Sequence, residues 1–236
     1  AAPCNIALMR QAQSVKKGVR ANGGTPREFC TITVTDGIAM GHEGMKASLI
    51  SREVIADSAE LTVRGHCYDA LVGIAGCDKS LPALMMSMVR LNVPSVFIYG
   101  GSILPGRYKG KDVTVVDVFE AVGKHSSGQM SSAELRKLEL VACPSAGACG
   151  GQFTANTMAC VSEAIGLALP YSAGTPAPYE ERDKYAKESG KTVMNLLAKK
   201  IKPRDIVTKK SLENAATIVA ATGGSTNAAL HLPAIA

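Results

Sequence analysis

Short apolar runs alternate with helical stripes along the chain, and this alternation predicts the order of its secondary structure. The run at 71–75 (LVGIA) is followed by Gly76, and the run at 95–99 (SVFIY) is followed by a glycine pair. Continuous apolar runs of this length beside glycine-rich turns are typical of buried strands. The segment FCTITVT alternates apolar residues with threonine, which also favours a strand. Together with the apolar sequence LVAC, these patterns predict strands at residues 29–35, 71–75, 95–99 and 140–143.

Helical periodicity occupies the segments around these strands. Leu8, Ala12, Val15 and Val19 recur at spacings of three and four residues, which places them on one face of a helix. The capping patterns Thr-x-x-Asp and Ser-x-x-Glu begin two further helices. We expect helices after the first at residues 51–63, 82–91, 114–122, 131–140, 182–200 and 209–221, and between Gly151 and Pro170.

The repeated order of strand, glycine-bearing turn and helix predicts an α/β fold. In such a fold a largely parallel sheet is covered by helices on both faces, as an αβα sandwich. Residues 171–181 are rich in Pro, Ala and Gly and predict a loop, which would separate two sub-lobes within a single domain of residues 1–236. Asp36, the Cys77-Asp78-Lys79 turn and Cys149 all follow predicted strands. If the sheet is parallel, these residues converge on one of its edges.

Composition narrows the class of protein. Hydrophobic residues make up 46% of the chain and charged residues 19%, which is typical of a well-packed soluble protein. The formal charge of +6 is spread over scattered Lys and Arg, so it gives no indication of nucleic-acid binding and fits small anionic substrates equally well. No apolar run reaches the length of a membrane-spanning helix and no leader opens the chain, so we expect a cytoplasmic protein. The chain begins at Ala and breaks off after a glycine-rich turn, which indicates a fragment.

The cysteines favour metal binding over disulfides. There are seven of them, an odd number without a signal peptide, and none forms a C-x-x-C pair. A zinc ribbon or a thioredoxin-like site therefore has no support. Any metal site must be assembled from distant segments, with free thiols as the alternative.

The turn at 77–79 places a thiol, a carboxylate and an amine side by side. Thiolates suit iron–sulfur clusters and carboxylates suit magnesium, so the adjacent residues predict two neighbouring metal centres. Asp36 and Asp78 could share a divalent cation, and Cys77 and Cys149 could share a cluster. The local sequence taken alone favours an ordinary turn with a buried thiol and a capping Asp.

Two other features have no assigned chemistry. The turn Gly223-Gly224-Ser225-Thr226-Asn227 feeds a helix start; it fits an N-cap better than an anion site. We expect each of the histidines to be structural or solvent-facing; they are His42, His66, His125 and His231.

Several strings of the sequence resemble those of the dihydroxy-acid and sugar-acid dehydratase family. They are PCN, VTDGIAMGHEGM, SREVIADS, AGCDKSLP, YGGSILPG, CPSAGACGGQFTANTM and GGSTNAALHLPAIA. The similarity runs over essentially the whole chain and is greatest to members that act in branched-chain amino acid biosynthesis. It covers only the family's N-terminal domain, so it implies that the C-terminal β-barrel domain is absent from this chain.

The resemblance implies a set of metal ligands. Cys4, Cys77 and Cys149 match the ligands of a three-cysteine iron–sulfur cluster, for which we expect 2Fe-2S in preference to 4Fe-4S although three ligands serve either. Asp36 and Asp78 match magnesium ligands. Lys79 matches a lysine that is carbamylated and offers the metal an oxygen; the alternative is an ion pair with Asp78. The remaining cysteines, Cys30, Cys67, Cys143 and Cys160, match no ligand position and are expected to be structural.

The implied activity is that of a hydro-lyase. It would remove water from a 2,3-dihydroxy acid of the 2,3-dihydroxy-3-methylbutanoate type and give a 2-oxo acid, in the synthesis of valine, isoleucine and leucine. In the family the catalytic base and a further magnesium-binding glutamate lie in the C-terminal part, so we expect this chain alone to be inactive. The resemblance also implies a homodimer, with no nucleic-acid or membrane partner.

Two alternatives remain open. A sugar-acid dehydratase, acting on an aldonate or a phosphogluconate, shares the cluster and metal motifs and differs in its substrate pocket. The second is a non-catalytic iron–sulfur protein for electron transfer or sensing, in which Asp36 and Asp78 would have no role.

Overall fold

Two adjacent parallel strands lie at the centre of the computed structural model, which describes residues 2–236. β1 (Leu71–Ala75) and β2 (Ser95–Tyr99) pair in parallel over their whole length and are connected by α4 (Ser80–Leu91). Phe97 extends this pairing, because its N–H donates to the Leu167 carbonyl at 2.7 Å. The strands at 71–75 and 95–99 are thus confirmed at their expected bounds.

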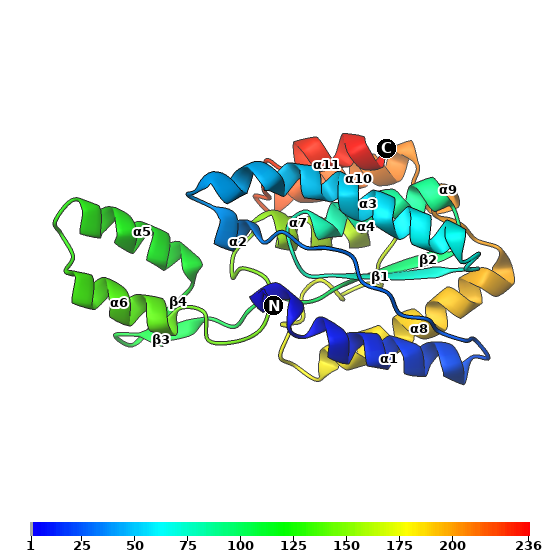
Figure 1. Cartoon of the computed structure of the whole chain (residues 1–236), viewed down its shortest axis with the longest axis horizontal. Coiled ribbons are helices and arrows are strands. Elements are labelled where there is room, and N and C mark those ends of the chain that lie inside the picture. The colour runs from blue at the N-terminus through cyan, green and yellow to red at the C-terminus, as the bar shows by residue number, and fades with distance from the viewer. Residues whose placement is uncertain (1) are drawn as a thin grey trace.

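Helices cover both faces of the strand pair (Figure 1). On one face lie α1 (Leu8–Ala21) and α8 (Glu181–Lys199), which pack against each other and against the strands. The other face is covered by α4 and α7 (Thr154–Ile165), with further helices outside them. These outer helices are α3 (Ser48–Gly65), α10 (Lys209–Ala221) and α11 (Ala228–Ile235), and the short α9 (Pro203–Ile206) packs on α4. The layered α/β arrangement is as expected, but within residues 2–236 the parallel sheet has only two strands and the predicted larger sheet is absent.

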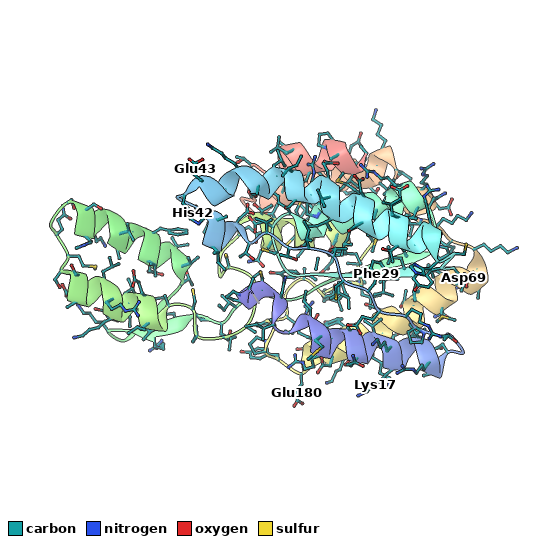
Figure 2. All side chains as sticks on the ribbon, viewed as in Figure 1. Lys17, Phe29, His42, Glu43, Asp69 and Glu180 are labelled. Carbon is teal, nitrogen blue, oxygen red and sulfur yellow. The ribbon has the colours of Figure 1, made fainter. Side chains whose placement is uncertain are left out.

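The strand predicted at 29–35 does not form. The segment is irregular, and Ile32 is 53% exposed. Glu28, the residue just before this segment, forms an ion pair with Lys16 of α1. Near the other end of the segment, the Val34 carbonyl accepts a hydrogen bond from the Cys77 thiol at 3.8 Å. A cavity of about 550 Å³ lies between residues 24–33 and β1, and Phe29 and Asp69, both labelled in Figure 2, are among the residues that line it.

The strand predicted at 140–143 is also wrong. Leu140 and Val141 are the last residues of α6 (Ser132–Val141), whose N-cap is Ser131. The amide of Ala142 still donates to the Leu138 carbonyl at 3.0 Å. The helix begun by the Ser131 cap thus continues through the short apolar run, because each further residue adds an intrahelical hydrogen bond.

A small lobe projects from the main body (Figure 1). It contains the antiparallel hairpin of β3 (Gly106–Tyr108) and β4 (Lys111–Val113), followed by α5 (Val115–Ser126) and α6. The predicted Thr-x-x-Asp cap of α5 is a full capping box, in which the Thr114 amide donates to Asp117 at 2.7 Å. The lobe has a separate small core of Val113, Ala121, Leu138 and Ala142.

No helix within residues 2–236 is both long enough and apolar enough to cross a membrane.

Candidate functional site

Three cysteines from distant parts of the chain face one cavity of about 160 Å³. Cys4 lies in the short helix η1 (Pro3–Asn5), Cys77 in the turn after β1, and Cys149 in the turn before α7. The Gly147 amide donates to the Pro3 carbonyl at 2.9 Å, which holds η1 against the Cys149 turn. The structure thus brings together the three thiols that the sequence predicts as cluster ligands. Cys143 lines the same cavity, which sequence reasoning missed.

The thiols influence one another electrostatically. Cys4 donates a hydrogen bond to Cys77; this contact and burial raise the pKa of Cys4 far above its usual range. The same hydrogen bond lowers the pKa of Cys77. Burial raises the pKa of Cys149 to about 11, with the nearby Asp78 and Cys77 charges as further causes. Three thiolates would be stable here only with positive charge in the cavity, which is what metal ions supply.

Asp36 and Lys79 form a buried ion pair next to these thiols. Asp36 begins the short helix α2 (Asp36–Ala39). Asp36 and Lys79 are each only 4% exposed. One carboxylate oxygen of Asp36 accepts from Lys79 Nζ at 2.6 Å, and the other accepts from the Ser48 hydroxyl at 2.6 Å. Lys79 thus forms a buried ion pair with Asp36, whereas the alternative expectation was a surface ion pair with Asp78.

Asp78 lies between the thiol cavity and this ion pair. It lines the cavity with the three cysteines. Its pKa is raised to about 6 by burial and by the adjacent Asp36, while the charge of Lys79 acts in the opposite direction. All six residues predicted to bind metal are thus gathered in one region.

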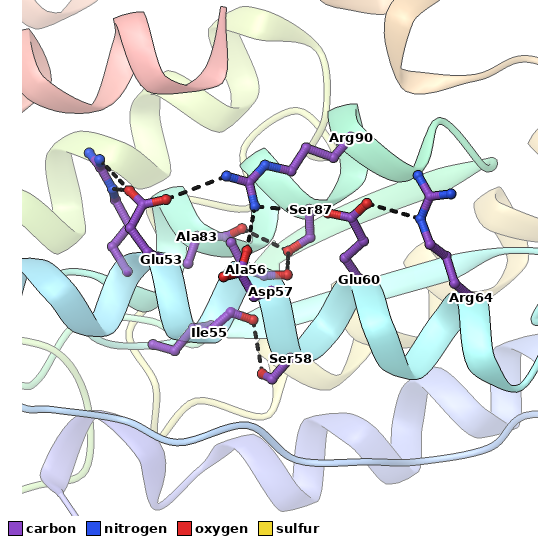
Figure 3. Close-up of polar contacts among 11 residues, drawn as sticks. Glu53, Ile55, Ala56, Asp57, Ser58, Glu60, Arg64, Ala83, Ser87 and Arg90 are labelled. Atoms are coloured by element: carbon purple, nitrogen blue, oxygen red, sulfur yellow. Dashed lines mark hydrogen bonds and ion pairs between the residues drawn. The ribbon is translucent and has the colours of Figure 1, made fainter.

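Contacts between α3 and α4 fix the elements that carry Ser48 and Lys79. Arg90 of α4 donates to Asp57 at 2.8 Å and pairs with Glu53 at 3.4 Å, both on α3 (Figure 3). Ser87 donates to the Ala56 carbonyl at 3.0 Å and so closes the helix pair on its buried side. The packing of α3 on α4 therefore helps to position Ser48 and Lys79, the two side chains that donate hydrogen bonds to Asp36.

The donor set fits two different metals. Among residues 2–236, no three His, Cys, Asp or Glu side chains are close enough to hold a single ion. Three thiols around a common cavity suit a cluster of several irons, which spans a larger distance than one ion. The oxygens of Asp36 and Asp78 suit a hard cation, for which a carbamate on Lys79 would add a third ligand.

The comparison with known proteins identifies the family. A family model described as "Dihydroxy-acid/6-phosphogluconate dehydratase N-terminal" matches residues 1–236. The chain belongs to this family. It is 94% identical over its whole length to a dihydroxy-acid dehydratase of Pelagibacter ubique, of which it covers 41%. A Parvibaculum lavamentivorans protein of the same name is 82% identical over 41% of its length, and one of Sulfurisphaera tokodaii is 56% identical over 42%. The chain therefore spans about two fifths of the length of these curated relatives.

His231 is buried, and the sequence pattern assigned it no chemical role. It is fully buried in α11, and Arg52 Nη1 donates to its Nδ1 at 3.1 Å. Arginine has no acceptor, so the imidazole proton lies on Nε2, which has no hydrogen-bond partner among residues 2–236. Burial and the nearby Arg52 and Lys79 charges lower the pKa of His231 to about 4. No signal in the local sequence pointed to this contact, because Arg52 and His231 are far apart along the chain.

We predict that His231 makes the protein less stable in weak acid. Its folded pKa of about 4 lies below the unfolded value near 6.5, so the unfolded state binds the extra proton between these values. Stability is complete above pH 6.5 and falls as the pH drops to 4, by up to about 3 kcal/mol. Urea unfolding at pH 7 and pH 5 should show a smaller difference for His231→Gln than for the wild type. The exposed His66 provides the control, and an equal change in His66→Gln would contradict the prediction.

Proposed function

We propose that the protein to which this chain belongs is a hydro-lyase that converts a 2,3-dihydroxy carboxylic acid into a 2-oxo acid. Cys4, Cys77 and Cys149 would hold an iron–sulfur cluster, and Asp36, Asp78 and a carbamate on Lys79 would hold Mg²⁺. One observation carries this proposal: Asp78, beside the Asp36–Lys79 pair, lines the same cavity as the three thiols. The cluster and the magnesium would then act on one substrate.

The reaction removes a proton from C2 and hydroxide from C3, and the resulting enol tautomerises to the ketone without any redox change. When bound, a cluster held by Cys4, Cys77 and Cys149 would supply Lewis acidity for the leaving hydroxyl, and Mg²⁺ held by Asp36, Asp78 and the Lys79 carbamate would supply positive charge that favours loss of the C2 proton. The chain's residues orient these groups. Ser48 keeps one Asp36 oxygen in place, and the 4% exposure of Lys79 keeps bulk water from the amine. Carbon dioxide reacts with an uncharged amine, and a bound dication would stabilise the carbamate that forms.

The catalytic base and a further magnesium ligand would come from outside residues 1–236. We therefore propose that these residues alone do not turn over substrate. The chain's 41% coverage of its relatives supports this view.

The substrate class has two candidates. The names of the relatives favour a dihydroxy acid. The similarity of the sequence motifs favours one of the branched-chain type, as in the synthesis of valine, isoleucine and leucine. The family description also includes 6-phosphogluconate dehydratase, which favours a sugar acid as the second candidate. Turnover of the two substrate types by the full-length protein distinguishes them. A cluster used only for electron transfer is disfavoured, because it leaves the buried Asp36–Lys79 pair beside it without a purpose.

Anaerobic reconstitution with iron and sulfide tests the cluster ligands. We expect Cys4→Ser, Cys77→Ser and Cys149→Ser each to lose most of the visible chromophore and of the bound iron. Cys143→Ser is the sharpest control, because Cys143 lines the same cavity but is exposed. If Cys143 proves essential, or if the other three are dispensable, the cluster is built differently and the proposed mechanism fails.

A further inference from the structure

Among the three candidate cluster ligands, Cys149 is the one that lies in an irregular turn. Cys4 belongs to η1, and the Cys77 carbonyl accepts hydrogen bonds from the first two amides of α4. The turn around Cys149 instead contains three glycines, at positions 147, 150 and 151. Glycine loses more conformational freedom on folding than any other residue. This turn therefore needs contacts from neighbouring elements to keep one conformation.

Backbone hydrogen bonds fix the residues just before Cys149. The Ala148 amide donates to the Gly101 carbonyl at 2.9 Å, and the Ala148 carbonyl accepts from the Ile103 amide at 2.7 Å. The segment that follows β2 thus holds the first half of the turn. These bonds end at Ala148, so the Cys149 carbonyl and the two glycines after it depend on other partners.

The Asn156 side chain, on α7, holds the second half of the turn. Its Nδ2 donates to the Cys149 carbonyl at 3.0 Å and also to the Gly151 carbonyl. Its Oδ1 accepts from the Tyr99 hydroxyl at 2.5 Å. Tyr99 is the last residue of β2 and is fully buried. The amide thus connects the turn to the end of the central strand pair.

The chemistry of the partners fixes the orientation of this amide. The two carbonyls can only accept, so they require the NH₂ group of Asn156, and the carbonyl oxygen of the side chain is left for the hydroxyl of Tyr99. Neither Asn156 nor Tyr99 is among the described residues that line the cluster cavity. Both side chains therefore act on that cavity through the backbone of the turn.

We propose that Asn156, oriented by Tyr99, is a positioning residue that holds the Cys149 turn so that its thiol faces the cluster cavity. This inference rests on the proposed function, because the benefit of a fixed thiol is retention of the cluster. Partners that lie behind a metal ligand and orient it typically change metal affinity by about tenfold to a hundredfold.

Amide hydrogen exchange in the iron-free, full-length protein tests the positioning without any cluster. Asn156→Asp keeps the size of the side chain and the acceptor for Tyr99, but it turns an oxygen toward the two carbonyls in place of the donor. We expect the amides of residues 147–151 to exchange about tenfold faster, because local opening of the turn then costs less free energy. Tyr99→Phe should give a smaller change in the same direction, and it serves alone if Asn156→Asp does not fold.

Loss of iron to a chelator after anaerobic reconstitution measures the effect on the cluster. We expect this loss to be about tenfold faster in Asn156→Asp than in the wild type. Thr157→Val is the matched control on the same helix. The Thr157 hydroxyl accepts from the Ser225 amide at 2.9 Å and donates to the Gln152 carbonyl at 3.3 Å, and neither bond involves residues 147–151. This variant should lower stability to urea but leave the exchange at 147–151 and the loss of iron unchanged.

The two readouts separate failure of this inference from failure of the proposed function. Unchanged exchange in Asn156→Asp, or equally faster exchange in Thr157→Val, would overturn the positioning role and leave the proposed function in place. Faster exchange with unchanged loss of iron would overturn the link between the turn and the cluster. A wild-type protein that takes up no iron would overturn the proposed cluster and this inference with it.

Discussion

Replacing Lys79 by methionine should destabilise the protein by about 3–5 kcal/mol, the usual cost of breaking a buried ion pair from one side. Methionine fills a similar volume, but it leaves the buried Asp36 carboxylate with the Ser48 hydroxyl as its one remaining side-chain partner within the described part of the chain. The uncompensated charge either stays buried or takes up a proton, and both alternatives cost free energy. Urea unfolding at pH 7 measures the change.

The second partner and an exposed pair supply the controls for this result. Asp36→Asn in the Lys79→Met background removes the unpaired charge, so it should recover a large part of the lost stability. Lys46 forms an ion pair with Glu43 at 2.5 Å on the surface, and Lys46→Met should cost less than about 1 kcal/mol. Equal losses for Lys79→Met and Lys46→Met would show that burial of the pair has no energetic weight.

Replacing Gly76 by alanine should both destabilise the protein and impair cluster assembly. A Cβ at this position would overlap the backbone carbonyl of Cys4, so η1 must move away from the turn that carries Cys77. Such overpacking against backbone typically costs about 1–3 kcal/mol. The shift also separates Cys4 from Cys77, so less iron should be retained after reconstitution. Urea unfolding and bound iron per chain report the two effects separately.

Gly123 is the matched control for Gly76. It lies inside α5, and a Cβ there would meet no other atom within 4 Å. Gly123→Ala should therefore raise stability by about 0.5–1 kcal/mol, through helix propensity alone, without changing bound iron. If Gly76→Ala retains the iron of the wild type, the close approach of η1 to this turn is not required for the cluster.

Local signals in the sequence were sufficient for many of the elements. The run at 71–75, the run at 95–99 and the Thr114 cap each depend on a few neighbouring residues, and each is confirmed. The segment 29–35 fails because strand formation needs a partner edge within reach, which a pattern of alternating residues cannot specify. The run at 140–143 fails because a helix cap nine residues earlier determines its conformation.

The candidate site was predicted for a partly incorrect reason. We expected Asp36 to reach the site by following a strand to a common sheet edge. No strand precedes it; instead the side chain is held by Ser48 and Lys79 at the start of α2. The contact of His231 with Arg52 could not be predicted, because the two residues are far apart in the sequence and follow no local spacing.

The order of the elements along the chain bears on the path by which the protein folds. α3, β1, α4 and β2 are consecutive between Ser48 and Tyr99, so their contacts close short loops and carry a small entropy cost. α1 packs on α8, which begins only at Glu181, and this contact closes one of the longest loops in the chain. We therefore expect α1 to dock late in folding. Cys4 lies just before α1, so it should be the last of the three thiols to arrive, and a nascent chain would complete its metal-binding cavity only after α8 has been made.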